Sequence, residues 1–226
     1  MRVIIWLSHA VLIAATQCSV DNGISSPSPT KSFIAEAALI SSAPNMTIAI
    51  TNHYGSQLSL SFGLDASSPP PYGNPQPTEL ADSSSTQYIY PDEWAGRVAI
   101  GPNLNPYGSK IEGSFKNSSV DIDVSYVDGY SVPITCSSEG EAFTGCNLDL
   151  FKTPCENQVD GPVCLNPARD IANGPPAPFF APCAGAAYTF PNDNGANRGG
   201  LSSNFVSCCI GTTCAAPLRQ LPNSTI

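Results

Sequence analysis

The chain has 226 residues, and its 18 acidic and 9 basic side chains make up only 12% of it, about half the share usual in soluble domains. Hydrophobic residues still reach 42%, which excludes a disordered polyelectrolyte and allows a buried core. The net charge of −9 repels phosphate backbones and anionic lipid headgroups, so we expect no nucleic-acid partner.

The N-terminal residues indicate export. Arg2 precedes an apolar run over residues 3–15 that is too short to span a bilayer but is typical of a secretory signal peptide. We expect cleavage between Ala15 and Ser19, with residues 1–18 as the signal peptide and residues 19–44 as a flexible, Ser/Pro-rich arm. No later run is long enough to cross a membrane, so the sequence predicts a secreted protein without a membrane span, which we expect to be a monomer.

Short alternating segments predict a β-sandwich within residues 45–226. Apolar residues alternate at Ile48 and Ile50 and again at Leu58, Leu60 and Phe62, which predicts a β-hairpin around a turn near residues 52–55. The same reasoning predicts further strands at residues 86–90, 96–100, 111–115, 120–126 and 130–135. The sheet lobe should therefore span about residues 45–135.

Residues 136–226 should form a smaller lobe with return strands. Asn166, Pro167 and Gly174 are start and stop signals that predict a short helix over residues 167–173. An even number of cysteines in an exported chain, without zinc spacing, predicts four disulfides and no metal or other cofactor. All of them lie in this lobe: Cys136, Cys146, Cys155, Cys164, Cys183, Cys208, Cys209 and Cys214.

Three Asn-x-Ser/Thr triplets, at Asn45, Asn117 and Asn223, are expected glycosylation sites on the surface. After the signal peptide the chain has one histidine, His53, in a predicted turn, and it has no nucleophile elbow, phosphate-binding loop or HExxH motif. Ser-His-Asp and Cys-His mechanisms therefore fit poorly. Carboxylates remain, and they suit sugars because a pair can protonate a glycosidic oxygen and stabilise the anomeric carbon.

The densest acidic group lies in residues 120–130. On a strand, Asp121 and Asp123 share one face while the apolar residues between them share the other. Asp128 would reach the acidic face only through a β-bulge near Val127. The alternative is that Asp128 and Gly129 form a plain hairpin turn and the other two carboxylates a solvated face.

The same segment carries a family resemblance. Residues 123–133, Asp-Val-Ser-Tyr-Val-Asp-Gly-Tyr-Ser-Val-Pro, resemble the Asp-Val-Ser-Leu-Val-Asp-Gly-Phe-Asn-Val-Pro string that marks thaumatin-like proteins. Other pieces that are similar to the family follow in its order at residues 47–52, 94–98, 146–150, 164–167 and 183–193. The resemblance covers about residues 46–193.

This resemblance implies a flattened antiparallel β-sandwich with a small disulfide-rich second lobe of loops and short helix. It also implies an acidic cleft between the lobes, built in the family from one Arg, one Glu and three Asp. By position the cleft carboxyls fall on Glu112, Asp123, Asp128 and Asp193. The family's Arg has no clear match, and we expect Lys110 to supply the positive charge, without the fork of an arginine.

The chain departs from the family in having eight cysteines after the signal peptide where plant members have sixteen, which is closer to reduced thaumatin-like proteins secreted by fungi. The order of the cysteines suggests the pairs Cys146–Cys183 and Cys155–Cys164, although eight cysteines allow 105 connectivities. The tail from residue 195 is not explained by the resemblance.

Two hypotheses for function follow. In the first, the protein binds and slowly hydrolyses β-1,3-glucan of cell walls as a weak endo-β-1,3-glucanase, with Glu112 as acid and Asp123 or Asp128 as base or nucleophile. Tyr126 and Tyr130 would stack on sugar rings if exposed. In the second, a non-catalytic wall-associated or host-interaction protein, antifungal or effector-like, uses the acidic surface only to bind. The missing Arg and the shortened lobe favour the second.

Overall fold

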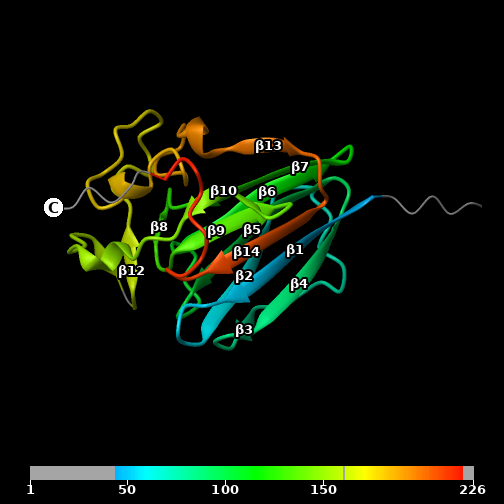
Figure 1. Ribbon diagram of the computed structural model, residues 1–226, viewed down its shortest axis with the longest axis horizontal. Coiled ribbons are helices and arrows are strands. Elements are labelled where there is room, and N and C mark those ends of the chain that lie inside the picture. Colours follow the sequence, from blue (N-terminus) through cyan, green and yellow to red (C-terminus); the bar gives the residue numbers. More distant parts are fainter. Residues whose placement is uncertain (1–43, 160, 221–226) are drawn as a thin grey trace, which may run out of the picture. The chain divides into compact units, whose positions relative to one another are not determined.

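The computed structural model describes residues 44–159 and 161–220. The expected signal peptide, almost all of the expected arm and the triplet at Asn223 lie outside the described residues. Within them, strands dominate and the helices are short 3₁₀ turns (Figure 1): η1 (Leu150–Lys152), η2 (Ala181–Cys183) and η3 (Asn194–Ala196). No helix in this part of the chain is long and apolar enough to cross a membrane.

One sheet has five strands in the order β10-β9-β14-β1-β4. They are β1 (Asn45–Asn52), β4 (Ser85–Pro91), β9 (Ile134–Ser138), β10 (Glu141–Cys146) and β14 (Phe205–Ile210). Neighbouring strands are antiparallel except β1 and β14, which run parallel. The tail of the chain therefore supplies a central strand, which the sequence resemblance did not explain.

The other large sheet has six strands in the order β13-β7-β6-β5-β2-β3. They are β2 (Leu58–Leu64), β3 (Thr78–Leu80), β5 (Trp94–Gly101), β6 (Ser109–Lys116), β7 (Ser119–Ser125) and β13 (Arg198–Leu201). The predicted hairpin of β1 with β2 is wrong, because β1 pairs with β4 and β14 whereas β2 pairs with β3 and β5. Alternation identified both strands, but it does not say which strand pairs with which.

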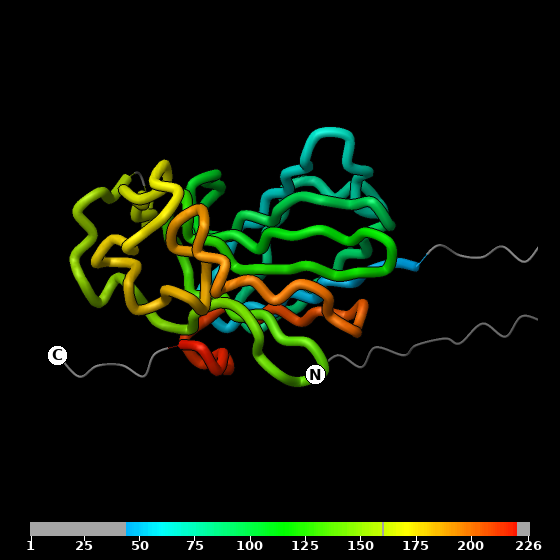
Figure 2. Tube along the Cα trace, turned by 90° about the horizontal axis from the view of Figure 1, so that it is seen from above, coloured from blue at the N-terminus to red at the C-terminus, as the bar shows by residue number. Residues whose placement is uncertain are grey.

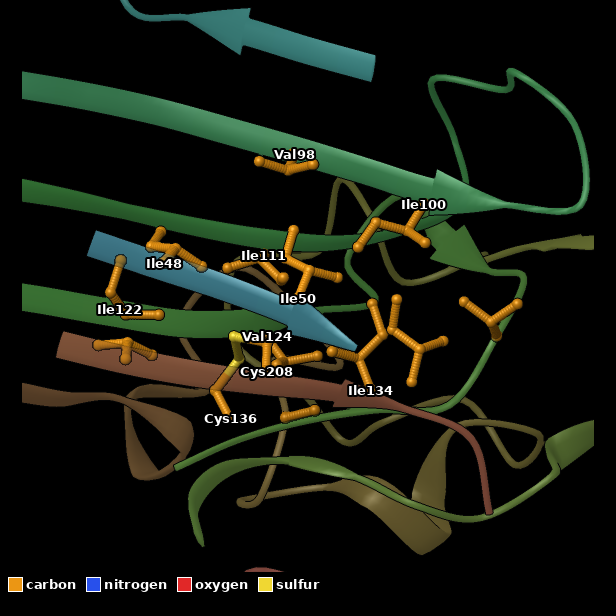
Figure 3. Packing of buried hydrophobic residues seen from close by; sticks show 14 of the residues in the cluster. Ile48, Ile50, Val98, Ile100, Ile111, Ile122, Val124, Ile134, Cys136 and Cys208 are labelled. Atoms are coloured by element: carbon orange, nitrogen blue, oxygen red, sulfur yellow. A yellow bond between two sulfur atoms is a disulfide. The ribbon is translucent and has the colours of Figure 1, made fainter. Parts of the chain in front are cut away.

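The core lies between these two sheets. Ile48 and Ile50 of β1 lie beside Ile111 of β6, and all three are at most 1% exposed (Figure 3). Val124 of β7 belongs to the same buried cluster. Because side chains alternate along a strand, burying these residues turns their neighbours outward. The β-sandwich predicted from alternation is confirmed.

The segment between β10 and β13, yellow to orange in Figure 2, forms the second lobe. Its strands β11 (Gln158–Val159) and β12 (Val163–Leu165) form a three-stranded sheet with β8 (Gly129–Tyr130), which precedes β9 in the chain, in the order β11-β12-β8. Four disulfides are formed, and both expected pairs are present: Cys146–Cys183 and Cys155–Cys164. Cys136–Cys208 joins β9 to β14, and Cys209–Cys214 closes a short loop.

The helix predicted over residues 167–173 is wrong. Asn166 does accept a hydrogen bond from the Ala168 N–H at 2.9 Å, but only a turn follows. Its amide Nδ2 donates to the carbonyls of Tyr126 at 2.9 Å and Thr189 at 2.7 Å. Asn166 therefore ties three segments together, and this buried network replaces the helix that its capping preference indicated.

The Cys136–Cys208 bridge should be the disulfide with the larger effect on stability. It closes 72 residues of chain between buried cysteines, whereas Cys209–Cys214 closes 5. Loop-closure entropy predicts a loss of about 4 kcal/mol for the double change of Cys136 and Cys208 to Ala, against about 2 kcal/mol for Cys209 and Cys214. Urea unfolding of both double variants measures the difference, and equal losses would contradict the assignment.

Candidate functional site

Two carboxyl side chains lie directly opposite each other on the outer face of the six-stranded sheet. The register of the antiparallel strands β6 and β7 pairs Glu112 with Asp123. The flanking residues Ile111 and Val124 point into the core, so this pair points away from it. Cβ atoms of directly opposed residues lie about 5 Å apart. The structure thus brings together two of the four carboxyls that the resemblance selected.

Asp123 is the carboxyl whose protonation is most strongly altered. Burial raises its pKa to about 8, and the neighbouring carboxylates of Glu112 and Asp121 contribute to the same rise. Asp123 is therefore mostly protonated at neutral pH, since a low-polarity setting and like charges both disfavour the ionised form. A protonated Asp123 beside Glu112 gives this face a hydrogen-bond donor and an acceptor side by side.

Asp121 closes the edge of this face toward β13. It pairs with Gly199 of β13, and a Cβ added to that glycine would lie 3.2 Å from the Asp121 carboxyl carbon. A side chain at this position would therefore require the Asp121 carboxyl to shift by a few tenths of an ångström. The Oδ1 atom of Asp121 is buried and has no hydrogen-bond partner among residues 44–159 and 161–220.

Tyr188 stands on the same face, and sequence reasoning missed it. Its N–H donates to the Val124 carbonyl at 2.9 Å, and its carbonyl accepts from the Tyr126 N–H at 2.8 Å. The segment around Tyr188 therefore pairs with the C-terminal end of β7, with Tyr188 opposite Ser125. Since Ser125 and Asp123 are two residues apart on the strand, the Tyr188 ring lies on the face of the sheet that carries Asp123. Burial raises the pKa of the Tyr188 hydroxyl, with a smaller contribution from carboxylates that include Asp123.

Asp128 lies in an ion cluster and not in a hairpin turn. Gly129, which follows it, begins β8 and pairs with β12, so the hairpin alternative is wrong. The Asp128 carboxylate pairs with the Lys110 ammonium, and its other oxygen lies 3.3 Å from Nη2 of Arg169. No β-bulge brings Asp128 onto the face of Glu112 and Asp123. Asp128 is connected to that face only through its ion pair with Lys110, which lies two residues before Glu112 on β6.

The sequence suggested that Lys110 supplies a positive charge to a ligand, but the structure gives its ammonium another partner. Only 5% of the residue is exposed, and its ammonium is paired with Asp128. Burial lowers the pKa of Lys110, while the Glu112 carboxylate acts in the opposite direction. Removing Asp128 would leave a buried ammonium without its partner, which is strongly unfavourable.

Asp193 serves its own loop. It is 7% exposed, and its Oδ2 accepts hydrogen bonds from the Thr189 hydroxyl at 2.8 Å, the Thr189 N–H at 3.3 Å and the Gly185 N–H at 3.2 Å. These bonds hold the turn that carries Tyr188. Asp193 therefore positions one side of the polar face without presenting its carboxylate there.

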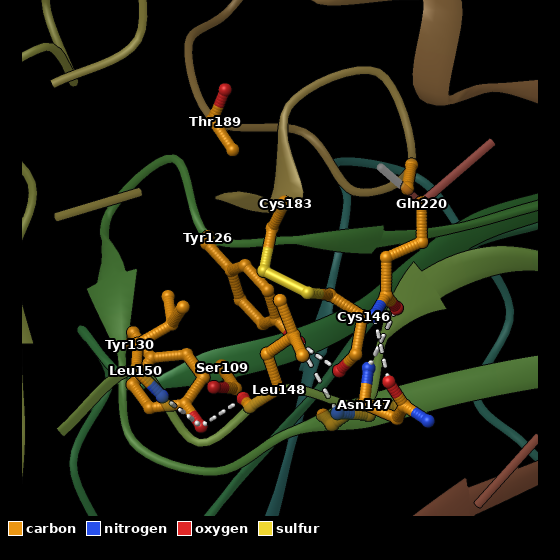
Figure 4. The surroundings of a disulfide bond; sticks show 12 residues. Ser109, Tyr126, Tyr130, Cys146, Asn147, Leu148, Leu150, Cys183, Thr189 and Gln220 are labelled. Carbon is orange, nitrogen blue, oxygen red and sulfur yellow. Dashed lines mark hydrogen bonds between the residues drawn. A yellow bond between two sulfur atoms is a disulfide. The ribbon is translucent and has the colours of Figure 1, made fainter. Parts of the chain in front are cut away.

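Tyr126 and Tyr130 cannot stack on a sugar ring, because both are completely buried. The Tyr126 hydroxyl donates to the Cys146 carbonyl at 3.2 Å, and that of Tyr130 donates to the Leu148 carbonyl at 2.9 Å. Figure 4 shows the Tyr126 ring beside the Cys146–Cys183 disulfide and Tyr130 near Leu150. The two tyrosines join the sheet lobe to the disulfide-rich lobe.

An arginine also lies opposite Glu112, which the sequence comparison did not assign. The register pairs Arg97 of β5 with Glu112, continuing the row that ends at Asp123. Its side chain, however, lies over Gly63, and its Nη1 is 4.0 Å from Asp65. The outward position of Arg97 between Gly96 and Val98 was the signal that could have identified it.

A cavity of about 110 Å³ lies elsewhere, in the disulfide-rich lobe. Its lining includes Pro154, Pro167, Phe179 and Phe180, and none of the four selected carboxyls. The acidic pair is therefore not enclosed by this cavity. Within the described ranges, no group of three or more His, Cys, Asp or Glu side chains is placed to hold a metal ion.

Comparisons with known proteins give a likeness of fold. No family model and no curated sequence matches the chain. The chain is similar to the protein elicitor MoHrip2 from Magnaporthe oryzae, at a TM-score of 0.38 and 14% identity over 73% of this chain and 98% of that one. It is also similar to the thaumatin-like xylanase inhibitor TLXI, at 0.35 and 14% over 72% and 97%.

Stability should depend on pH through Asp123. Its pKa rises from 3.8 to about 8 on folding, so the folded state binds a proton that the unfolded state releases. The resulting stabilisation is complete below about pH 4 and is lost as the pH rises toward 8. Asp123→Asn keeps the side chain neutral, and we expect its melting temperature to exceed that of the parent by several degrees at pH 8 but not at pH 4.

Thermal melting between pH 4 and pH 9 measures this difference, with the exposed Asp170→Asn as the matched control. Parallel pH profiles for the parent and Asp123→Asn would contradict the assignment.

Proposed function

We propose that this is a secreted protein of the thaumatin-like type that binds β-1,3-glucan of cell walls at the Glu112–Asp123 pair. The observation that carries the proposal is the strand register, which sets the two carboxyls opposite each other on the outer face of the sheet. Four disulfides support secretion, because such bridges persist in oxidising compartments.

The protonation of the pair suits a neutral polyhydroxyl ligand. Each sugar hydroxyl can donate one hydrogen bond and accept others. The Glu112 carboxyl oxygens can accept, whereas Asp123, with a pKa near 8, can donate. Hydrogen bonds to a charged group are the stronger ones, at about 1.5–3 kcal/mol each. The two carboxyls therefore match adjacent hydroxyls without requiring a charged ligand.

Slow hydrolysis is the second candidate, and the spacing of the pair favours it. Retaining glycosidases use two carboxyl groups about 5 Å apart, and the Cβ atoms of directly opposed strand residues are separated by a similar distance. Protonated Asp123 would be the acid and Glu112 the nucleophile, the reverse of the roles first expected. Binding remains the leading proposal, because Asp128 and Asp193 are held by other partners and the described cavity lies away from the pair.

The acidic residues beside the pair retain a structural role in this proposal. The ion pair of Lys110 with Asp128 anchors the N-terminal end of β6. Asp193 accepts a hydrogen bond from Thr189 and so stabilises the turn that carries Tyr188. Asn45 and Asn117, two of the three expected glycosylation sites, are exposed and stay proposals, Asn117 in the tight turn between β6 and β7.

Binding to soluble β-1,3-glucan should weaken about tenfold in Glu112→Gln, which replaces a carboxylate acceptor by a weaker amide acceptor, and in Asp123→Ala, which removes the donor. The exposed Glu79→Gln on β3 of the same sheet is the matched control and should bind like the parent. Affinity electrophoresis gives the binding constants, and a reducing-sugar assay on the parent separates binding alone from hydrolysis. If both variants bound the glucan as tightly as the parent does, the Glu112–Asp123 pair would not be the binding site.

A further inference from the structure

We propose that Tyr107 and Arg169 form a second subsite for the same glycan. This subsite lies next to the N-terminal end of β6, on the side of Lys110 away from the Glu112–Asp123 pair. This inference rests on the proposed function, because it extends the glucan chain from the carboxyl pair. Tyr107 is 43% exposed, and the Arg169 guanidinium carbon lies 5.4 Å from the centre of its ring. The ring is therefore accessible to a ligand while Arg169 lies beside it.

One contact restrains the backbone of Tyr107 and another restrains its ring. The Tyr107 N–H donates to Oδ1 of Asn105 at 2.9 Å, which fixes the backbone of the turn before β6. The guanidinium on the ring adds a cation–π attraction. A ring that is already ordered loses little conformational entropy when a ligand stacks on it.

Arg169 connects this ring to the carboxyl pair. Its Nη2 lies 3.3 Å from Asp128, Asp128 pairs with Lys110, and Lys110 precedes Glu112 by two residues on β6. Its Nε lies 3.8 Å from Asp170. The remaining nitrogen, Nη1, has no ion-pair or hydrogen-bond partner within residues 44–159 and 161–220, so it is free to donate to a hydroxyl.

Ring and guanidinium together match a pyranose. The apolar face of the sugar can pack on the exposed part of the Tyr107 ring, while a hydroxyl that projects past the ring edge accepts from Arg169. The surroundings are apolar, because Leu104 and Ile171 in the same two segments are also exposed. Tyr107 thus supplies the stacking surface that Tyr126 and Tyr130, being buried, do not.

The spacing makes the subsite dependent on ligand length. Five residues of chain separate Tyr107 from Glu112, which is at most about 17 Å when extended. Residues 109–112 are extended in β6 and alone span about 10 Å, so we expect a hexasaccharide to bridge the carboxyl pair and the ring, whereas a disaccharide bound at the pair contacts the pair alone. We therefore expect Tyr107→Ala to weaken binding of laminarihexaose about tenfold and to leave binding of laminaribiose unchanged.

Isothermal titration calorimetry with both oligosaccharides tests this. Tyr72→Ala is the matched control, since Tyr72 is 56% exposed but donates its N–H to Ile89 of the five-stranded sheet. Arg169→Lys keeps the positive charge beside Asp128 but loses the bidentate geometry of the guanidinium and its planar contact with the Tyr107 ring. We therefore expect it to weaken binding of the hexasaccharide by less than Tyr107→Ala does, and to leave binding of the disaccharide unchanged. Melting temperatures confirm that each variant is folded.

The outcomes separate the subsite from the proposed function. Equal affinity of Tyr107→Ala and parent for laminarihexaose, with weaker binding in Glu112→Gln, overturns the subsite and leaves the carboxyl pair. An equal loss for both oligosaccharides also overturns it, because Tyr107 would then act on the pair itself. A parent protein that binds neither oligosaccharide overturns the proposed function and the subsite with it.

Discussion

The pairing register of β6 and β7 is the constraint on which the polar face depends. Alternation along these strands buries Ile111 and Val124 and turns Glu112 and Asp123 outward, directly opposite each other. A slip of one residue would expose the core and bury the acids. The hydrophobic effect therefore fixes the spacing of the carboxyls, and their proximity, together with burial, raises the pKa of Asp123.

Alternation was enough to predict the strands and the sandwich, because it reports which side of each strand is buried. It could not predict partners, which is why β1 and β2 were expected to pair and instead lie in different sheets. The parallel pairing of β1 with β14 joins residues 158 positions apart, and no local signal in the sequence specifies such a contact. The expected helix failed because Asn166 bonds to Tyr126 and Thr189 as well as capping its turn.

The site was predictable only in part. Glu112 and Asp123 were found from the family resemblance and the alternation of β7. Lys110 was expected to bind a ligand, but its ammonium pairs with Asp128. The sequence could not predict this ion pair, because the position of Asp128 depends on the path of the chain after β7. Tyr188 was missed because its position depends on a bridge to Ser125 across 63 residues of chain. Burial of aromatic rings likewise depends on the second lobe, which covers Tyr126 and Tyr130.

The most direct test of the account is an NMR titration of the Asp123 carboxyl carbon, with and without a β-1,3-glucan oligosaccharide. The account predicts an apparent pKa near 8 for Asp123 in the free protein and a change in that pKa when the glycan is added. An Asp123 that titrates near its ordinary value of 3.8 and does not respond to the glycan would contradict it.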